Sequence, residues 1–263
     1  MTAPSLAFAD TATMLRRDVR HAVRFPMVTI SGLLVPVLFL LLFDGVFGHT
    51  LRAGLGSAVS GGYINYVLPG ILVMAAASVA ESTALGVNAD MGEGIITRFR
   101  TMAIWRPSVL AGPVTGSVVR TLITGAAICL FALVLGFSPN ATALNWLAAI
   151  GLFALLGMAL SWLTVAFGLL AKTPAGANSL SLILLVLPFV SSAFVPTATM
   201  PAGVRAFAEY QPFTSVIDTF RSLLTRTPMG NHGIVAVAWC AGIAAVGFLW
   251  AVKLYNRDSP VAS

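Results

Sequence analysis

Residues 180–196, LSLILLVLPFVSSAFVP, decide the fold of this chain, because an apolar run there leads directly into Pro188 and ends at Pro196. A second block, QPFTSVIDTFR at residues 211–221, follows after Pro201. Proline removes a helical hydrogen-bond donor and favours kinks. Backbone polar groups at membrane depth must find hydrogen-bond partners inside the protein. We therefore expect broken, re-entrant helices that line a protein-walled path, not a plain helix–loop–helix.

The composition predicts an integral membrane protein. Of the 263 residues, 58% are hydrophobic and only 9% are charged, whereas a soluble domain carries about 25% charged residues. A membrane-spanning helix needs about 20 mostly apolar residues. Six stretches qualify, at about 27–47, 63–84, 113–136, 145–171, 177–197 and 233–254. We expect an all-α protein of six transmembrane helices, with no room for a separate soluble domain.

The distribution of basic residues predicts the orientation. If the N-terminus is cytoplasmic, ten basic residues lie inside and four outside, with Arg120 within a span. The four outside are Arg52, Arg205, Arg221 and Arg226, and Asp218 can pair with Arg221 on a helix. The positive-inside rule therefore predicts that both termini are cytoplasmic. The high ratio of Arg to Lys, with abundant Ala and Gly, suggests a bacterial genome, so we expect the plasma (inner) membrane of a bacterium. Tyr63, Tyr66 and Trp146 are expected as anchors at the outer membrane interface.

The net charge of +6 does not indicate nucleic-acid binding, because no long water-exposed face carries the basic residues. Instead, residues 1–26 predict an amphipathic helix in the cytoplasmic membrane interface, with Arg16, Arg20 and Arg24 on its polar side. This helix either only anchors the chain or also contacts a cytoplasmic partner. Residues 27–257 then form the transmembrane domain.

The loop between the second and third spans carries a short apolar face. Ile95, Phe99 and Met102 recur at positions i, i+4 and i+7, which is typical of one side of a helix. A cytoplasmic helix too short to bury itself needs a membrane or a partner groove. A solvated basic loop explains Arg98 and Arg100 but not the apolar residues.

Two charges fall within the predicted spans, Glu81 near the inner end of the second and Arg120 in the third. Intramembrane charges are costly and mark functional sites by default, and these two could pair at the same depth. The alternative is a structural brace or side chains that snorkel to the interface. The three histidines have no partner at metal-ligand spacing, so we expect no metal site.

Taken in order, these features resemble ABC-2 type transporter permeases, in particular the daunorubicin/doxorubicin-resistance branch. Residues 180–221 are similar to the penultimate span and outer re-entrant helices of that family, although many relatives have glycine near Ser192 and Ala193. The loop before Pro107 is similar to the family's coupling helix. The resemblance implies that this loop docks on an ATPase, through Gly92, Glu93, Arg98, Phe99, Arg100 and Met102. The expected outer gate comprises Pro188, Ser191, Ser192, Phe194, Pro196, Pro212 and Phe213.

No G-x-x-x-x-G-K-[ST] motif occurs in the sequence. The resemblance therefore implies a non-enzymatic permease subunit without a cofactor of its own, which exports a hydrophobic or amphiphilic small molecule. ATP and Mg would be bound by separate ABC ATPase subunits. The other expected partners are a second permease copy or sister permease, and membrane lipid. Alternatives are an ABC-2 permease for a polysaccharide or lipid-linked substrate, a proton-coupled secondary transporter, and a membrane-embedded hydrolase, for which no nucleophile or metal constellation is recognised.

Overall fold

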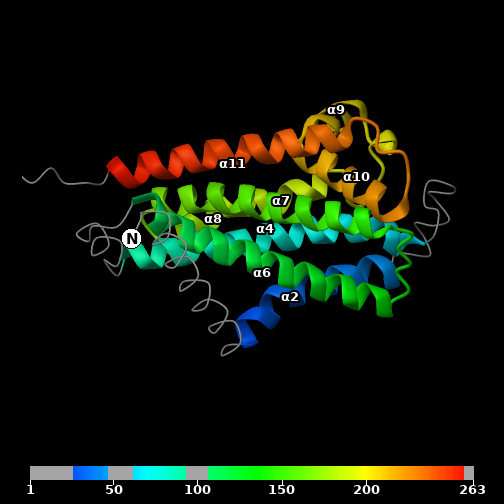
Figure 1. Ribbon diagram of the computed structural model, residues 1–263, viewed down its shortest axis with the longest axis horizontal. Helices are drawn as coiled ribbons and strands as arrows, with labels where there is room; N and C mark the ends of the chain where they lie inside the picture. The colour runs from blue at the N-terminus through cyan, green and yellow to red at the C-terminus, as the bar shows by residue number, and fades with distance from the viewer. Residues whose placement is uncertain (1–25, 47–61, 93–105, 258–263) are drawn as a thin grey trace, which may run out of the picture.

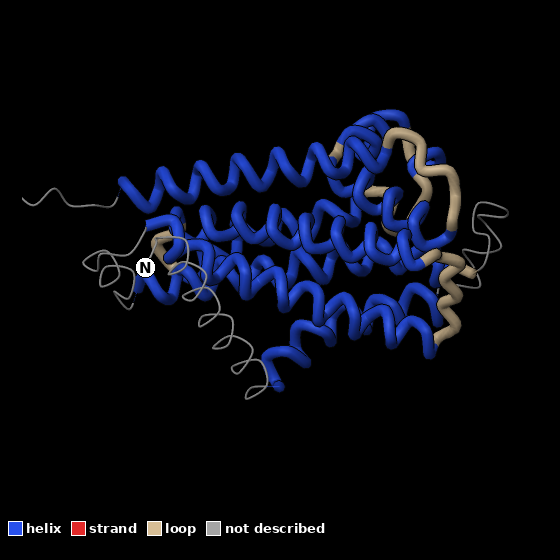
Figure 2. The backbone as a smooth tube through the Cα atoms, viewed as in Figure 1, coloured by secondary structure: helices blue, strands red, loops and turns tan. Residues whose placement is uncertain are grey.

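The computed structural model describes residues 26–46, 62–92 and 106–257, and within these ranges all regular structure is helical (Figure 1, Figure 2). The N-terminal segment 1–25, and most of the loop predicted to dock an ATPase, lie outside the described residues. The helices in the six predicted spans are α2 (Pro26–Leu41), α4 (Tyr63–Gly92), α6 (Arg106–Val134), α7 (Ala143–Leu170), α8 (Pro174–Val186) and α11 (His232–Arg257). The remaining helical segments are η1 (Leu42–Val46), η3 (Leu187–Val190), η4 (Thr197–Thr199), α9 (Ala202–Tyr210) and α10 (Pro212–Thr225).

Four helices in the described ranges are long and apolar enough to cross a membrane, namely α4, α6, α7 and α11. The two other predicted spans correspond to α2 with the π-helix η1, and to α8 with the 3-10 helix η3, both of which are shorter. The second predicted span, 63–84, continues to Gly92, and the third begins at Arg106 instead of residue 113. The length and apolar composition of these four helices therefore identify a membrane protein.

Helix α4 is the centre of the bundle. It is buried along nearly its whole length and packs against α2, α6, α7, α8 and α10, while α11 lies along the outer side of α7 (Figure 1). Consecutive long helices run in alternating directions, so their connections gather at two ends. We call the end with α9 and α10 the α10 end, and the other the Gly92 end.

Glycines bring the helices into close contact. A Cβ atom added at Gly168 of α7 would lie 2.6 Å from the carbonyl oxygen of Ala84 in α4, and one at Gly247 of α11 would lie 2.7 Å from the backbone nitrogen of Leu163 in α7. Small residues at such crossings are the usual way for membrane helices to gain van der Waals contact. The bundle therefore has little space for larger side chains along these two interfaces.

Local sequence also satisfies the polar groups at helix ends. Thr142 and Thr173 cap α7 and α8, each accepting a hydrogen bond from a backbone nitrogen three residues on. At the Gly92 end, the buried Asn88 side chain donates to the carbonyls of Gly168 and Ala171 at 3.1 and 2.7 Å. Since the last carbonyls of a helix have no intrahelical partner, Asn88 closes the end of α7.

The contact between Gly70 of α4 and Ala193 gives a test of the fold. A Cβ at Gly70 would lie 2.5 Å from the Cβ and 2.9 Å from the Cα of Ala193, whereas nothing lies within 4 Å of such an atom at Gly86 on the same helix. We expect Gly70→Ala to lower stability by about 1–3 kcal/mol through overpacking. Gly86→Ala should leave stability unchanged or raise it, because alanine is the better helix former by about 1 kcal/mol.

Thermal denaturation of the two detergent-purified variants, followed by the loss of the monodisperse chromatographic peak, makes the comparison. Equal melting temperatures for Gly70→Ala and the parent would contradict this packing.

Candidate functional site

The chain leaves α-helical geometry at the prolines that the sequence singled out. Helix α8 ends at Val186, η3 carries Pro188, and a turn follows through residues 191–195, after which Pro196 is the N-cap of η4. We call residues 187–196 the broken segment. Pro212 occupies the first turn of α10, after Gln211. Proline is well tolerated there, because a backbone N–H in the first turn has no hydrogen-bond partner within the helix.

The turn within the broken segment needs no glycine. Ser191 is extended, with φ −122° and ψ −174°, and among the described residues Arg226 alone has a positive φ without being glycine. Ser192 and Ala193, where the resemblance pointed to glycine in many relatives, therefore adopt ordinary backbone angles. What this position requires is a small side chain, because Ala193 packs on Gly70.

Four alternating carbonyls of the broken segment accept hydrogen bonds from side chains. The hydroxyl of Ser191 donates to the carbonyl of Pro188, and the amide of Gln211 donates to that of Val190. On the α4 side, the hydroxyl of Tyr66 donates to the carbonyl of Ser192 at 3.0 Å, and that of Tyr63 to the carbonyl of Phe194 at 3.0 Å. The buried, irregular backbone is thus hydrogen-bonded by protein groups, as non-helical backbone at membrane depth must be.

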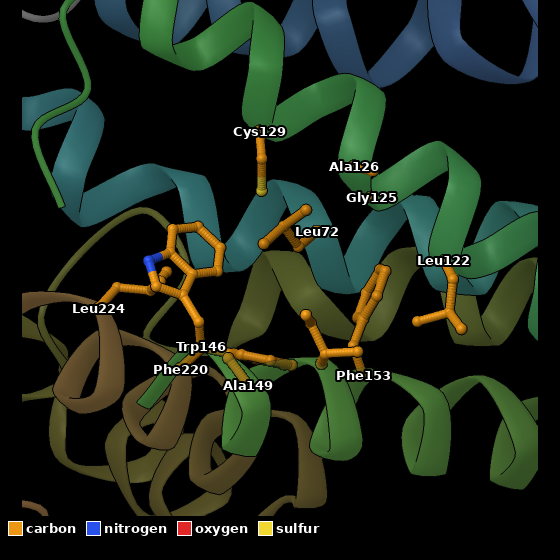
Figure 3. A pocket seen from close by; sticks show the side chains of 11 residues that line it. Leu72, Leu122, Gly125, Ala126, Cys129, Trp146, Ala149, Phe153, Phe220 and Leu224 are labelled. Atoms are coloured by element: carbon orange, nitrogen blue, oxygen red, sulfur yellow. The ribbon is translucent and has the colours of Figure 1, made fainter. Parts of the chain in front are cut away.

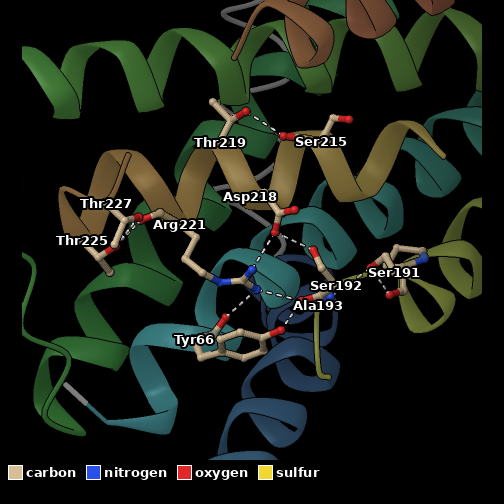
Figure 4. Close-up of polar contacts among 11 residues, drawn as sticks. Tyr66, Ser191, Ser192, Ala193, Ser215, Asp218, Thr219, Arg221, Thr225 and Thr227 are labelled. Carbon is tan, nitrogen blue, oxygen red and sulfur yellow. Dashed lines mark hydrogen bonds and ion pairs between the residues drawn. The ribbon is translucent and has the colours of Figure 1, made fainter. Parts of the chain in front are cut away.

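Arg221 of α10 joins three elements in what we call the Arg221 cluster, consisting of Tyr66, Ser192, Asp218 and Arg221 (Figure 4). Its guanidinium donates to a carboxylate oxygen of Asp218 at 2.6 Å, to the carbonyl of Ser192 at 2.7 Å and to that of Tyr66 at 3.2 Å. Its Cζ atom lies 3.8 Å from the centre of the Tyr66 ring. The hydroxyl of Ser192 also donates to Asp218, at 2.7 Å.

The geometry of the cluster suits a polar link between helices. The Asp218 and Arg221 side chains are only 24% and 18% exposed, so their charge-assisted bonds are weakly screened and stronger than neutral ones. The predicted pairing of these two residues is confirmed. Because the acid and the base are bonded to each other, the arrangement holds α4, the broken segment and α10 together and presents no reactive group.

Aromatic rings cover the other side of the broken segment. Phe194 stacks on Phe43 of η1 with ring centres 4.3 Å apart, and on Phe189 at 5.2 Å. Phe39 of α2 meets Phe189 edge-on at 5.6 Å. The broken segment therefore lies between α4 and the α2–η1 unit.

Helices α9 and α10 differ in how they are covered. The α10 face formed by Phe213, Ile217, Phe220 and Leu224, at helical spacing, is fully buried. In α9 only Ala208 is buried. Phe207 and Tyr210 on that short helix are exposed, so α9 resembles an interfacial helix and α10 an integral part of the bundle.

The remaining predicted residues are placed as follows. Gly92 is the exposed last residue of α4, whereas Glu93, Arg98, Phe99, Arg100 and Met102 lie outside the described residues. Glu81 is half-buried on α4. Arg120 of α6 donates from Nη2 to the hydroxyl of Thr83 at 3.2 Å, two residues beyond Glu81. The Glu81–Arg120 pair stays a prediction. Across the described residues, no group of three or more His, Cys, Asp or Glu side chains is arranged to hold a metal ion.

One sequence-based assignment is wrong. Tyr63 and Tyr66 were expected as anchors in the membrane interface, but they are 0% and 6% exposed and bond the broken segment. Their polar tips find buried carbonyls instead of lipid headgroups, which also satisfies an amphipathic side chain. Gln211 was not singled out at all, although its place just before Pro212 was a signal that it precedes a helix.

The sequence is similar to those of known transport proteins. The family model described as ABC-2 type transporter matches residues 9–225. The chain is 30% identical over 260 residues to the daunorubicin resistance ABC transporter permease protein DrrB1 of Streptomyces coeruleorubidus, covering 98% of this chain and 89% of that protein. It is 24% identical over 257 residues to the probable doxorubicin resistance ABC transporter permease protein DrrC of Mycobacterium tuberculosis, covering 98% and 92%. It is also 27% identical over 238 residues to the putative transport permease ycf38 of Porphyra purpurea, covering 88% and 79%.

Two arginine–carboxylate pairs of different burial test the Arg221 cluster. Arg221→Gln leaves Asp218 without its ion-pair partner and the Ser192 carbonyl with fewer donors, so we expect a loss of about 1–3 kcal/mol of stability. Arg205→Gln removes the partner of Glu209 in a pair whose side chains are 49% and 41% exposed, which should change stability by about 0–1 kcal/mol.

Denaturant or thermal unfolding of both variants in detergent measures the difference. Arg221→Lys should lie between the parent and Arg221→Gln, because lysine keeps the charge but loses the planar fork that reaches three acceptors. Equal effects of Arg221→Gln and Arg205→Gln would show that the cluster does not hold the helices.

Proposed function

Because the chain belongs to the ABC-2 type transporter family, we propose that it is the permease subunit of an ATP-driven exporter of hydrophobic or amphiphilic small molecules. The observation that carries the proposal is that two drug-resistance permeases match it over 98% of its length. The long apolar helices place the protein in a membrane. Membership of this family also decides against a secondary transporter and a membrane-embedded hydrolase.

ATP hydrolysis is assigned to separate ABC ATPase subunits, which would bind ATP and Mg, since the sequence contains no P-loop. The further partner is a second copy of this permease or a sister permease. Polysaccharide or lipid-linked substrates remain the alternative cargo.

We further propose six passes with both termini in the cytoplasm of a bacterium, residues 1–26 as the interfacial helix and 27–257 as the transmembrane domain. The passes beyond the four long helices would be α2 with η1 and α8 with η3. The alternating direction of the helices supports this (Figure 1). So does the sequence, since Arg106, Lys172, Lys253 and Arg257 are at the Gly92 end and the positive-inside rule makes that end cytoplasmic.

Single cysteines test the topology. In a background with Cys129 and Cys240 replaced by alanine, Leu51→Cys should react with a membrane-impermeant maleimide in intact cells. Thr101→Cys should react only after permeabilisation, because the two loops lie on opposite sides. The reversed pattern would reject both the orientation and the assignment of the cytoplasmic loop.

Coupling to the ATPase is proposed for Gly92, Glu93, Arg98, Phe99, Arg100 and Met102. Gly92 ends α4, the central helix, so a force on the following loop would act directly on the core. The spaced apolar residues support docking into a groove, and the arginines suit an acidic rim around it.

ATP-driven uptake of doxorubicin into inverted membrane vesicles tests the function and the coupling together. The chain co-expressed with its ATPase should accumulate the drug when the proton gradient is collapsed, and a partner ATPase without its P-loop lysine should not. Phe99→Ala should weaken assembly with the ATPase by about tenfold or more, as loss of a binding hot spot does.

Phe207→Ala is the matched control, because it removes the same side chain from an exposed position of α9, at the α10 end of the bundle. Uptake that requires the proton gradient and not ATP would overturn the proposed function. Normal assembly and transport in Phe99→Ala would overturn the docking helix alone.

The outer gate is proposed for Pro188, Ser191, Ser192, Phe194, Pro196, Pro212 and Phe213. Irregular backbone at membrane depth occurs where it is buried in protein or lines a path, and this segment is held by side chains of two different helices, α4 and α10, so a relative movement of these helices would act on it. The alternative is a passive segment, an interfacial helix that lies flat on the outer leaflet.

Accessibility at Val195 distinguishes the two. A spin label there should change its collision rate with a water-soluble relaxant when the ATPase subunits are trapped with ATP. A label at Ile234, which is exposed at the start of α11, should not respond. A nucleotide-insensitive, lipid-exposed label at Val195 would leave only the passive segment.

A further inference from the structure

An apolar cavity of about 270 Å³ lies between α4, α6, α7 and α10, near the α10 end (Figure 3). Leu72, Leu122 and Cys129 line it from α4 and α6, and Trp146 and Phe153 from α7 (Figure 3). Gly125 brings α6 close to α7, since a Cβ there would lie 2.2 Å from a ring carbon of Phe153. The cavity is separate from the Arg221 cluster, which is polar.

The lining selects the chemistry of an occupant. None of the side chains around the cavity carries a charge, and the only polar hydrogens among them belong to the Trp146 indole and the Cys129 thiol. Pockets for drug-sized ligands usually add several placed polar groups that fix orientation. Apolar cavities of about 150 Å³ stay dry and take up apolar molecules such as benzene, and this one is larger.

The position of the cavity indicates that its occupant comes from the surrounding lipid. Ile150 lines the cavity and is also 49% exposed on the outside of α7, where Leu147 is 67% exposed. On α6, Ala126 lines the cavity and is exposed, next to the exposed Ile123. In a membrane-spanning bundle such apolar outer surfaces contact acyl chains, so the cavity is continuous with the lipid-facing surface.

We propose that this cavity binds the distal part of a phospholipid acyl chain from the leaflet at the α10 end. The chain enters between α6 and α7, past Ala126 and Ile150, and reaches Phe220 and Leu224 of α10. The ring of Phe220 meets that of Phe153 edge-on, at 5.9 Å. Since Phe220 directly precedes Arg221, the site brings lipid against the helix that carries the Arg221 cluster.

A photoreactive lipid tests the proposal. The purified full chain is placed in nanodiscs of phosphatidylglycerol and phosphatidylethanolamine that contain a phospholipid with a diazirine at the end of one acyl chain. After illumination, mass spectrometry should find adducts within residues 122–129 and 146–153. The readout requires neither an ATPase nor transport, so it is independent of the proposed function.

Variants that fill the cavity provide the comparison. Ala126→Leu and Ala149→Leu, from the α6 and α7 sides, should each reduce those adducts by about tenfold, the change expected when about two buried methylenes are displaced. Ala238→Leu, the same substitution at an exposed position of α11, should not. Adducts on α11 around Val246 and Leu249, which face outward, serve as the internal reference in every variant.

Three results would overturn the site. The first is labelling of residues 122–129 and 146–153 no stronger than that of α11. The second is unchanged labelling in both filled variants while they remain monodisperse. The third is loss of the adducts on addition of doxorubicin at transport concentrations, which would assign the cavity to the exported molecule instead of lipid.

Discussion

The structure depends most on a constraint of the backbone: the carbonyls of the broken segment, which follows α8, must be hydrogen-bonded by protein groups. Ser191, Gln211, Tyr66 and Tyr63 supply donors to four alternating carbonyls between Pro188 and Phe194. A buried carbonyl left unpaired costs about 1–3 kcal/mol. These donors come from the segment itself, from the start of α10 and from α4, so satisfying the backbone also fixes where these elements lie.

Arg221 adds a charged component to the same arrangement. A largely buried guanidinium needs partners for its charge and its donors. Asp218, two carbonyls and the Tyr66 ring supply them at the two terminal nitrogens, whereas Nε is buried without a hydrogen-bond partner among the described residues. This also explains a basic residue on the side where the charge rule places few: Arg221 is held within the protein and does not act as a loop charge. The rule counts residues near the membrane ends, and it does not distinguish a solvated arginine from a buried one.

Local features of this fold were predictable from the sequence, and distant pairings were not. The break in the helix near Pro188, the buried face of α10 and the Asp218–Arg221 pair each depend on residues that are close together in the sequence. The bonds from Tyr66 to Ser192 and from Arg221 to Tyr66 join residues 126 and 155 positions apart. A single sequence shows that a tyrosine lies at a helix end. It does not show which partner the hydroxyl has, because a lipid headgroup and a buried carbonyl can both accept its hydrogen bond. Likewise, nothing local to Gly70 indicates that Ala193 will lie on it.

The contacts on the two sides of α10 determine the free energy that is needed to move this helix. On one side it holds the Arg221 cluster, and on the other Phe220 and Leu224 meet the apolar cavity. For α10 to act in a gate, a partner must shift its position from mostly closed to mostly open, which takes about 5.5 kcal/mol of differential binding. The hydrogen bonds that an open state would lose contribute about 0.5–3 kcal/mol each, so together they favour the closed state by a free energy of that order. On the apolar side, Phe220 and Leu224 are buried and Phe220 packs on Phe153 of α7, so a shift of α10 would also lose packing contacts. The Arg221 cluster and the buried apolar face therefore both hold α10 in its resting position.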